Sequence, residues 1–125
     1  MKESILREKA EAFATRIIKM NQYLVKEKRE FSMSGQVLRS GTSISANLAE
    51  AQFGQSKSDF ISKLSIAQKE ANETYLWLRN LFRGGYLTEV EFKSMESDVL
   101  SILKMISASI LTARKNECAH SSTNN

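Results

Sequence analysis

The sequence contains no proline, and glycine accounts for only five of its 125 residues. Proline and glycine are the main interrupters of helices, so their scarcity predicts a chain that is rich in α-helix. Cysteine and histidine are equally rare, since Cys118 and His120 are the only residues of their kinds. A single cysteine excludes an intramolecular disulfide and a cysteine-based metal knuckle.

Long hydrophobic runs are also missing. No stretch approaches the roughly 18 consecutive apolar residues that a membrane-spanning helix needs. The segment from Met1 to Ser4 leads directly into mixed-charge sequence and lacks the apolar run of a signal peptide. Together with the single cysteine near a polar end, these absences predict a soluble protein of the reducing cytoplasm, with no membrane contact.

What the sequence does contain is a hydrophobic pattern repeated in four segments. Apolar and small residues recur at alternating steps of four and three, which is the spacing of the buried seam in antiparallel helical bundles. We therefore expect helices over about 4–28, 34–52, 56–82 and 88–115. The predicted seam positions are Leu6, Ala10, Phe13, Ile17, Met20, Leu24, Val37, Gly41, Ile44, Leu48, Ala51, Phe60, Leu64, Ala67, Ala71, Thr74, Leu78, Leu81, Phe92, Met95, Val99, Ile102, Ile106, Ser109 and Ala113.

Capping signals separate these segments. Thr88 and Glu91 form the spacing of a capping box, and Ser56 with Asp59 resembles one. Short connections place sequential helices side by side and antiparallel. The sequence thus predicts an all-α, antiparallel up-down-up-down four-helix bundle, with one domain over residues 1–116. Residues 117–125 are polar, and we expect them to form a disordered tail.

Some apolar residues lie outside or beside the predicted seam. They can widen the core stripe, or they can form a second buried surface between subunits. Helices that are apolar on two sides usually bury both, so the second interpretation is favoured and predicts a homo-oligomer. The surplus residues are Ile5, Ile18, Trp77, Leu100, Leu103, Ile110 and Leu111.

The sequence offers no complete set of catalytic or metal-binding residues. Di-metal sites in four-helix bundles need Glu-x-x-His pairs, but the only histidine, His120, lies in the expected tail. Cys118 has no histidine or second cysteine placed to activate it. We therefore expect no enzyme, metal or cofactor, and interpret Glu50, Glu70 and Glu73 as acceptors for Arg39 and nearby polar groups inside the bundle.

The positive charge is uneven. The net charge is +4, and residues 1–40 hold nine Lys and Arg against five Asp and Glu. A continuous basic ridge beside the first seam could neutralise phosphates without sequence preference, and a ring of copies would multiply the contacts. The same residues could simply form a solvated face. The ridge consists of Lys2, Lys9, Arg16, Lys19 and Lys26.

Two motifs indicate a family. The run RSGTSISANLAEA from Arg39 to Ala51 is followed by Ser56 before Asp59-Phe60, and then by the stretch from Ile66 to Leu78 with its Gln-Lys-Glu-Ala and Trp-Leu pairs. Both resemble the signature of the bacterial four-helix-bundle proteins encoded by intervening sequences of large-subunit ribosomal RNA genes. The resemblance covers roughly residues 5 to 115.

The resemblance implies an up-down bundle that assembles into a ring, typically a cyclic homopentamer, and it implies no catalytic residue. The related accessory variability protein of diversity-generating retroelements is similar in fold and ring assembly, is basic, and binds nucleic acid and a reverse transcriptase. This chain departs from that branch because its net charge is only +4. The matching polar signature positions, whose implied role is structural, are Arg39, Ser43, Asn47, Glu50, Glu70 and Glu73.

Residues and resemblance together predict a non-enzymatic homo-oligomer, pentameric by resemblance, that acts as a nucleic-acid-associated adaptor. Its partners would be further copies of itself and RNA or DNA. The alternative is a protein-interaction scaffold that binds a partner protein and no nucleic acid. The low net charge and the surplus apolar surface favour this alternative.

Overall fold

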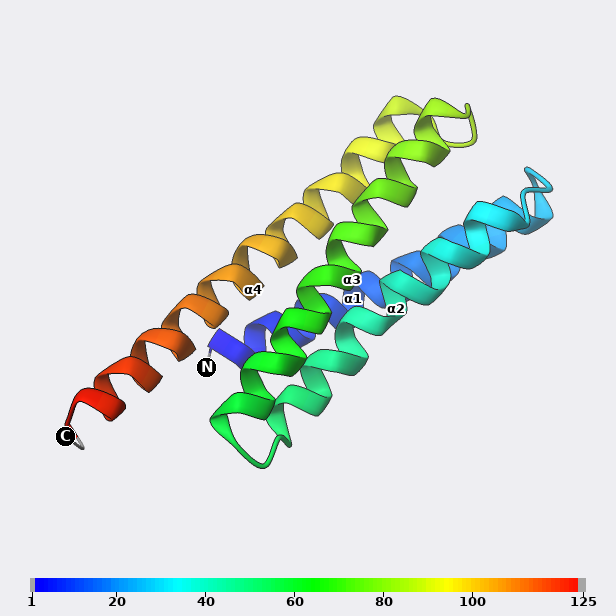
Figure 1. The fold of residues 1–125 in the computed structure, drawn as a ribbon. Coiled ribbons are helices and arrows are strands. Elements are labelled where there is room, and N and C mark those ends of the chain that lie inside the picture. Colours follow the sequence, from blue (N-terminus) through cyan, green and yellow to red (C-terminus); the bar gives the residue numbers. More distant parts are fainter. Residues whose placement is uncertain (1, 124–125) are drawn as a thin grey trace.

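The computed structural model describes the backbone of residues 2–123 and the side chains of residues 5–116, and it forms four long α-helices. They are α1 (Lys2–Lys26), α2 (Ser32–Gln52), α3 (Lys57–Arg83) and α4 (Glu89–Thr123). Short turns join them, so that successive helices run in opposite directions (Figure 1). The predicted all-α four-helix bundle is confirmed.

The core follows the predicted seam. Almost every seam position is buried, and the largest fully buried side chains include Phe13 on α1 and Ile102 on α4. Phe60 and Ser109 are exceptions because they are only partly buried, although Phe60 still packs against the core. Leu87, in the turn before α4, joins the core although it lies outside the four expected segments. A period of alternating threes and fours therefore identified most of the interior.

The turn between α1 and α2 is fixed by a buried carboxylate. Phe31 occupies the N-cap of α2 and makes no side-chain capping bond. Instead Glu30, which is 7% exposed, accepts hydrogen bonds from the backbone N–H groups of Ser32, Met33 and Ser34 at 3.2, 3.0 and 2.7 Å. These groups have no partner within the helix, and the carboxylate also complements the positive end of the helix dipole. Helix α2 consequently begins two residues before the expected start.

The other two helix starts use the predicted caps. The Ser56 hydroxyl accepts a hydrogen bond from the Asp59 N–H at 3.0 Å. At the start of α4 the Glu91 carboxylate accepts from the Thr88 N–H at 2.8 Å, and the Thr88 hydroxyl accepts from the Glu91 N–H at 3.1 Å. This reciprocal pair is a complete capping box.

Helices α1 and α2 are in close contact at a glycine, Gly41. A Cβ atom added to Gly41 would lie 2.8 Å from Cγ1 and 3.0 Å from Cγ2 of Ile17. Glycine costs about 1 kcal/mol relative to alanine inside a helix, so its presence here needs a packing reason. The contact with Ile17 supplies that reason.

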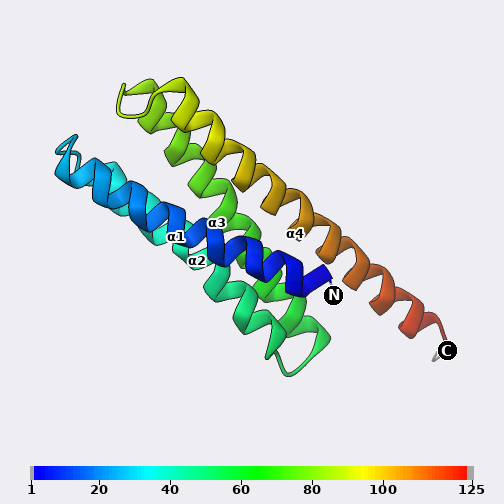
Figure 2. The same ribbon diagram turned by 180° about the vertical axis from the view of Figure 1, so that it is seen from behind.

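The last helix is longer than expected. Helix α4 has 35 residues and ends at Thr123. Residues 117–123, which the sequence places in a polar tail, continue α4; Asn124 and Asn125 lie outside the described residues. At 1.5 Å per residue the helix is about 52 Å long, and its C-terminal part continues away from the other three helices (Figure 2).

The surplus apolar residues fall into two groups. Ile110 is buried in the core, while Leu103 and Trp77 are partly buried and pack against it. The remaining four stay exposed by 43–57%: Ile5, Ile18, Leu100 and Leu111. Part of the surplus thus widens the core, and part remains on the surface. Within the described residues, no helix combines the length and apolar character needed to cross a membrane.

Candidate functional site

The basic ridge on α1 is partly present in the structure. The side chains of Lys9, Lys19 and Lys26 are exposed, and Lys26 lies in the last turn of the helix. From Lys9 to Lys26 the helix rises by about 25 Å. The side chain of Lys2, the fifth predicted member, lies outside the described side chains. Three lysines of one helix are therefore available to a large anionic partner.

Arg16, in the middle of the ridge, has a different role. Its Nη1 atom lies 2.6 Å from Oδ2 of Asp98, and its Nη2 atom donates to the Ser94 hydroxyl at 2.8 Å. Both partners are on α4, so Arg16 ties α1 to α4. Arg16 is thus a bridging residue whose charge is paired with that of Asp98, and its contact with phosphate stays a prediction. The pattern of one helix could not reveal a partner 82 residues away.

Two further cations, which the periodic pattern did not identify, lie in the α1–α2 turn just after Lys26. Lys28 places Nζ 6.0 Å from the centre of the Tyr23 ring, and the Arg29 guanidinium lies 5.5 Å from the centre of the Phe31 ring. Phe31 is 59% exposed. The signal was present in the sequence as the charged run that follows Lys26, but no periodic pattern links it to the ridge.

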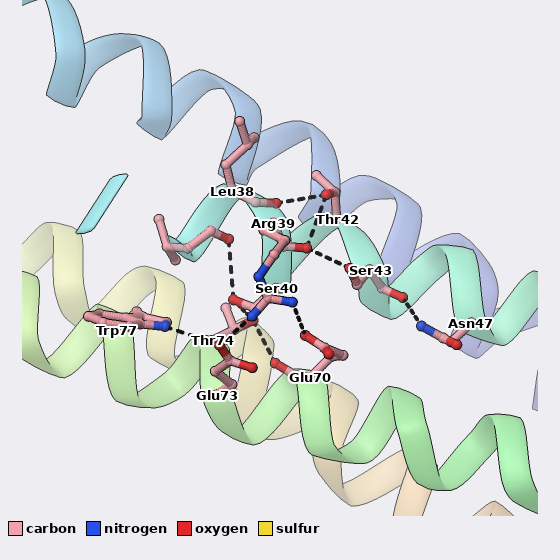
Figure 3. A network of polar contacts seen from close by, with 11 residues as sticks. Leu38, Arg39, Ser40, Thr42, Ser43, Asn47, Glu70, Glu73, Thr74 and Trp77 are labelled. Carbon is pink, nitrogen blue, oxygen red and sulfur yellow. Dashed lines mark hydrogen bonds and ion pairs between the residues drawn. The ribbon is translucent and has the colours of Figure 1, made fainter. Parts of the chain in front are cut away.

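A second polar cluster lies between α2 and α3 (Figure 3). Arg39 of α2 pairs with two carboxylates of α3, lying 3.3 Å from Glu70 and in closer contact with Glu73. The Trp77 ring N–H also donates to Glu73, at 3.4 Å. The Arg39 side chain is 51% exposed. The expectation that this cluster lies inside the bundle is therefore wrong, because it bridges two helices at the surface.

Charge and hydrogen bonding shift the titration of this cluster. The hydrogen bond from Arg39 lowers the pKa of Glu73 below its usual value of 4.5, against the opposing effect of desolvation, with a smaller contribution from Trp77. The same hydrogen bond with Glu73 is the largest cause that raises the pKa of Arg39. Both groups are thus stabilised in their charged forms, as expected for a paired guanidinium and carboxylate.

The other signature residues are not joined to this cluster by side-chain bonds across the helices. Ser43 donates to the Arg39 carbonyl at 2.6 Å, and Asn47 donates to the Ser43 carbonyl at 2.8 Å. Both bonds follow the α2 backbone (Figure 3). Glu50 pairs with Lys63 at 2.9 Å, one turn further along α2. The expected network of six residues is therefore three separate local arrangements.

The buried polar contact between α2 and α3 involves a different pair. The Thr74 hydroxyl lies 2.9 Å from the Ser40 hydroxyl, and both residues are fully buried. Thr74 also lies 2.8 Å from the Glu70 carbonyl, and Ser40 lies 3.4 Å from the Val37 carbonyl. Both buried hydroxyls thus have hydrogen-bond partners. The hydrophobic pattern predicted Thr74 as a seam residue, but it could not pair Thr74 with Ser40, which lies on another helix.

Metal chemistry has no visible support in the described part of the chain. Among the described side chains, no group of three or more histidine, cysteine, aspartate or glutamate residues could hold a metal ion. Cys118 and His120 lie outside the described side chains. The surface thus offers charged contacts: lysines on α1 and paired charges between α2 and α3.

The fold and these surfaces define a small helical bundle whose α2 and α3 carry a polar signature at their junction. The model of the 23S rRNA-intervening sequence protein family matches residues 2–108, and the chain belongs to this family. The resemblance inferred from the two motifs is thereby confirmed.

A solved structure supports the same assignment. The chain is similar to a Bacteroides thetaiotaomicron protein described as a protein with unknown function from the S23 ribosomal protein family. The two share 47% sequence identity, with a TM-score of 0.87 over 88% of this chain and 98% of the other. No curated protein matches the chain. Family and fold are thus established, and neither description names an activity.

Proposed function

We propose that this protein is a non-enzymatic, homo-oligomeric adaptor that associates with nucleic acid through the lysines of α1. The observation that carries the proposal is the exposure of Lys9, Lys19 and Lys26 along one helix. Lysine ammonium groups neutralise phosphates as point charges without reading sequence, so the binding would depend on charge and shape.

Oligomerisation strengthens this proposal. Three phosphate contacts per subunit correspond to a salt slope of only about −2 to −3 in log K against log salt. Several copies held together would add their contacts and raise the effective concentration of each further contact. The exposed Leu100 and Leu111 of α4 offer an apolar surface for such association. The stoichiometry of five rests on the family resemblance.

The test measures binding to structured RNA and to duplex DNA by fluorescence anisotropy across a salt series. We expect sub-micromolar affinity at physiological salt that falls steeply as salt rises. The triple variant K9E/K19E/K26E should reduce both the affinity and the salt slope, because three phosphate contacts per subunit are replaced by repulsion.

A matched control variant shows whether the affinity depends on the position of the lysines on α1 or only on the net charge. The variant K57E/K69E/K93E makes the same change in net charge at three exposed lysines of α3 and α4. It should retain most of the affinity if α1 is the contact surface. Equal loss in both variants, or no loss in the α1 variant, would contradict the proposal.

A specific observation also favours the second candidate, a protein-interaction scaffold. Arg16 is paired with Asp98, so part of the positive charge of the ridge is already offset within one subunit. The exposed apolar residues remain unexplained within one subunit. A pull-down whose captured protein persists after nuclease treatment, together with no measurable RNA affinity, would favour the scaffold.

A further inference from the structure

A groove lies beside the lysine ridge, between α1 and the beginning of α4. It has a volume of about 300 Å³. Its floor is formed by the buried side chains of Met20, Leu87 and Met95, together with the partly buried ring of Tyr23. Arg16 and Lys19 lie along one side, and Glu91 lies along the other. The groove is therefore apolar below and charged at its edges.

The charged edges are held in place by bonds already described. Arg16 is fixed by Asp98 and Ser94 across the two helices. Glu91 uses one carboxylate oxygen, Oε1, to accept from the Thr88 N–H. A carboxylate has a second oxygen that can accept further hydrogen bonds. The groove thus combines a flat aromatic ring, an acceptor on one edge and cations on the other.

This combination suits a nucleotide whose base is not paired. A base needs an apolar or aromatic surface for stacking, and the exocyclic amino groups of adenine, cytosine and guanine are donors for an acceptor such as Glu91. The phosphate needs a cation, which Lys19 provides at the edge and Lys28 provides near Tyr23. A duplex cannot use the groove, because its bases are stacked and paired.

We propose that the groove between α1 and α4 binds an unpaired nucleotide of single-stranded nucleic acid, with the base over Tyr23 and the phosphate at Lys19. The proposal rests on the adaptor function above and adds a preference to it. The ridge binds any phosphate backbone, whereas the groove favours loops and single-stranded segments. Strands with exposed bases should therefore bind more tightly than duplexes of equal length.

The experiment compares an RNA hairpin with an unpaired loop and a fully paired duplex of the same number of nucleotides. The loop carries 2-aminopurine, whose fluorescence falls when the base stacks. Wild-type protein should bind the hairpin more tightly and quench the loop probe. The variant Y23L keeps apolar volume but removes the aromatic ring. It should weaken hairpin binding by about tenfold, which is typical of one lost stacking contact, and abolish the quench.

Two controls accompany the variant. Binding of Y23L to the duplex should stay within about twofold of wild type, because the ridge is unchanged. The matched variant Y75L removes a partly buried tyrosine of α3, outside the groove. It should leave both affinities and the quench unchanged. Circular dichroism melting of each variant checks that the bundle still forms.

Each contrary outcome has a distinct meaning. Equal wild-type affinity for hairpin and duplex, with no effect of Y23L, would overturn the groove proposal and leave the adaptor function standing. Absence of binding to either nucleic acid would overturn both. If a polyglutamate peptide binds more tightly than the hairpin and loses affinity in Y23L, the occupant is an acidic peptide and the groove proposal is also overturned.

Discussion

Gly41 shows how one missing side chain determines a helix contact. Its position 2.8 Å from Ile17, measured to an added Cβ atom, leaves no room for alanine without movement of a β-branched side chain. Such side chains are stiff within helices. The gain of about 1 kcal/mol in helix propensity therefore competes with an overpacking penalty of about 1–3 kcal/mol.

We predict that Gly41→Ala lowers the free energy of unfolding by about 1 kcal/mol, because the packing term exceeds the propensity term. Urea denaturation measures this change. Ile17→Ala alone should cost about 2–5 kcal/mol, but in that background Gly41→Ala should become stabilising, since the clash is gone. A Gly41→Ala variant that is more stable than wild type would show that Ile17 adapts freely.

The ion pair of Glu73 predicts a pH dependence. Its folded pKa lies below the usual value of 4.5. The unfolded state therefore binds the proton more readily, so the contribution to stability is present above pH 4.5 and is lost as the pH falls through the lower folded value. The variant Glu73→Gln should be less stable than wild type at pH 7, and the difference should close as the pH is lowered toward 3.

Thermal melting between pH 3 and 7 measures that difference. The comparison should be repeated in an Arg39→Gln background, where the partner that lowers the Glu73 pKa is absent. In that background, the difference in melting temperature between chains with Glu73 and with Gln at that position should be smaller and should change little with pH. A pH-dependent gap that persists without Arg39 would assign the effect to another group.

At the scale of helix pairs, α2 and α3 are joined by a buried hydroxyl pair. Because Ser40 and Thr74 are both fully buried, removing one hydroxyl leaves the other with fewer partners. We predict that Thr74→Val lowers the free energy of unfolding by about 1–2 kcal/mol. The double variant Ser40→Ala/Thr74→Val should cost less than the sum of the two single variants, because no hydroxyl is then left at the contact. Strict additivity in urea denaturation would contradict this pairing.

The sequence predicted elements better than contacts between them. Periodicity identified four helices and nearly the whole core, because burial along one helix repeats at a fixed interval. It could not predict that Glu30 caps α2, since a glutamate preceding the N-cap is not a standard capping residue. It also placed the pairing of Arg39 inside the bundle. Whether a side chain at the junction of two helices points inward depends on how each helix is rotated about its own axis. The hydrophobic pattern of either helix alone does not specify that rotation closely enough.

For the candidate site, too, the sequence predicted features of single helices better than contacts between helices. The exposure of Lys9, Lys19 and Lys26 follows from their distance to the seam, so the sequence identified them. The partner of Arg16 depends on the placement of α4 against α1, and the groove at Tyr23 depends on it as well. Features confined to one helix could therefore be predicted. Features shared by the first and last helices required the structure.

At the scale of the whole molecule, exposed leucines indicate where copies would meet in the proposed oligomer. Leu100 and Leu111 are 44% and 57% exposed and are separated by eleven residues, which is close to three helical turns. They therefore lie on one side of α4. We predict that Leu100→Ser/Leu111→Ser shifts the protein toward monomer without unfolding it, because surface substitutions cost little folding stability.

Light scattering after size-exclusion chromatography measures the mass of each species. Leu76→Ser, at a residue of α3 that is 54% exposed, is the matched control and should leave the oligomer intact. A monomeric wild-type protein would contradict the homo-oligomer proposal. Dissociation by the Leu76 variant alone would place the interface on α3.

The length and position of α4 affect when this protein can assemble. Helices α1, α2 and α3 are complete at Arg83, and α4 is made after them. Synthesis proceeds at about 5–20 residues per second, so the 35 residues of α4 take about 2–7 s. Helical contacts between sequence neighbours form within microseconds to milliseconds. While these residues are being made, α3 lacks its partner helix, and in the proposed oligomer subunits that meet through α4 can join only once α4 has been synthesised.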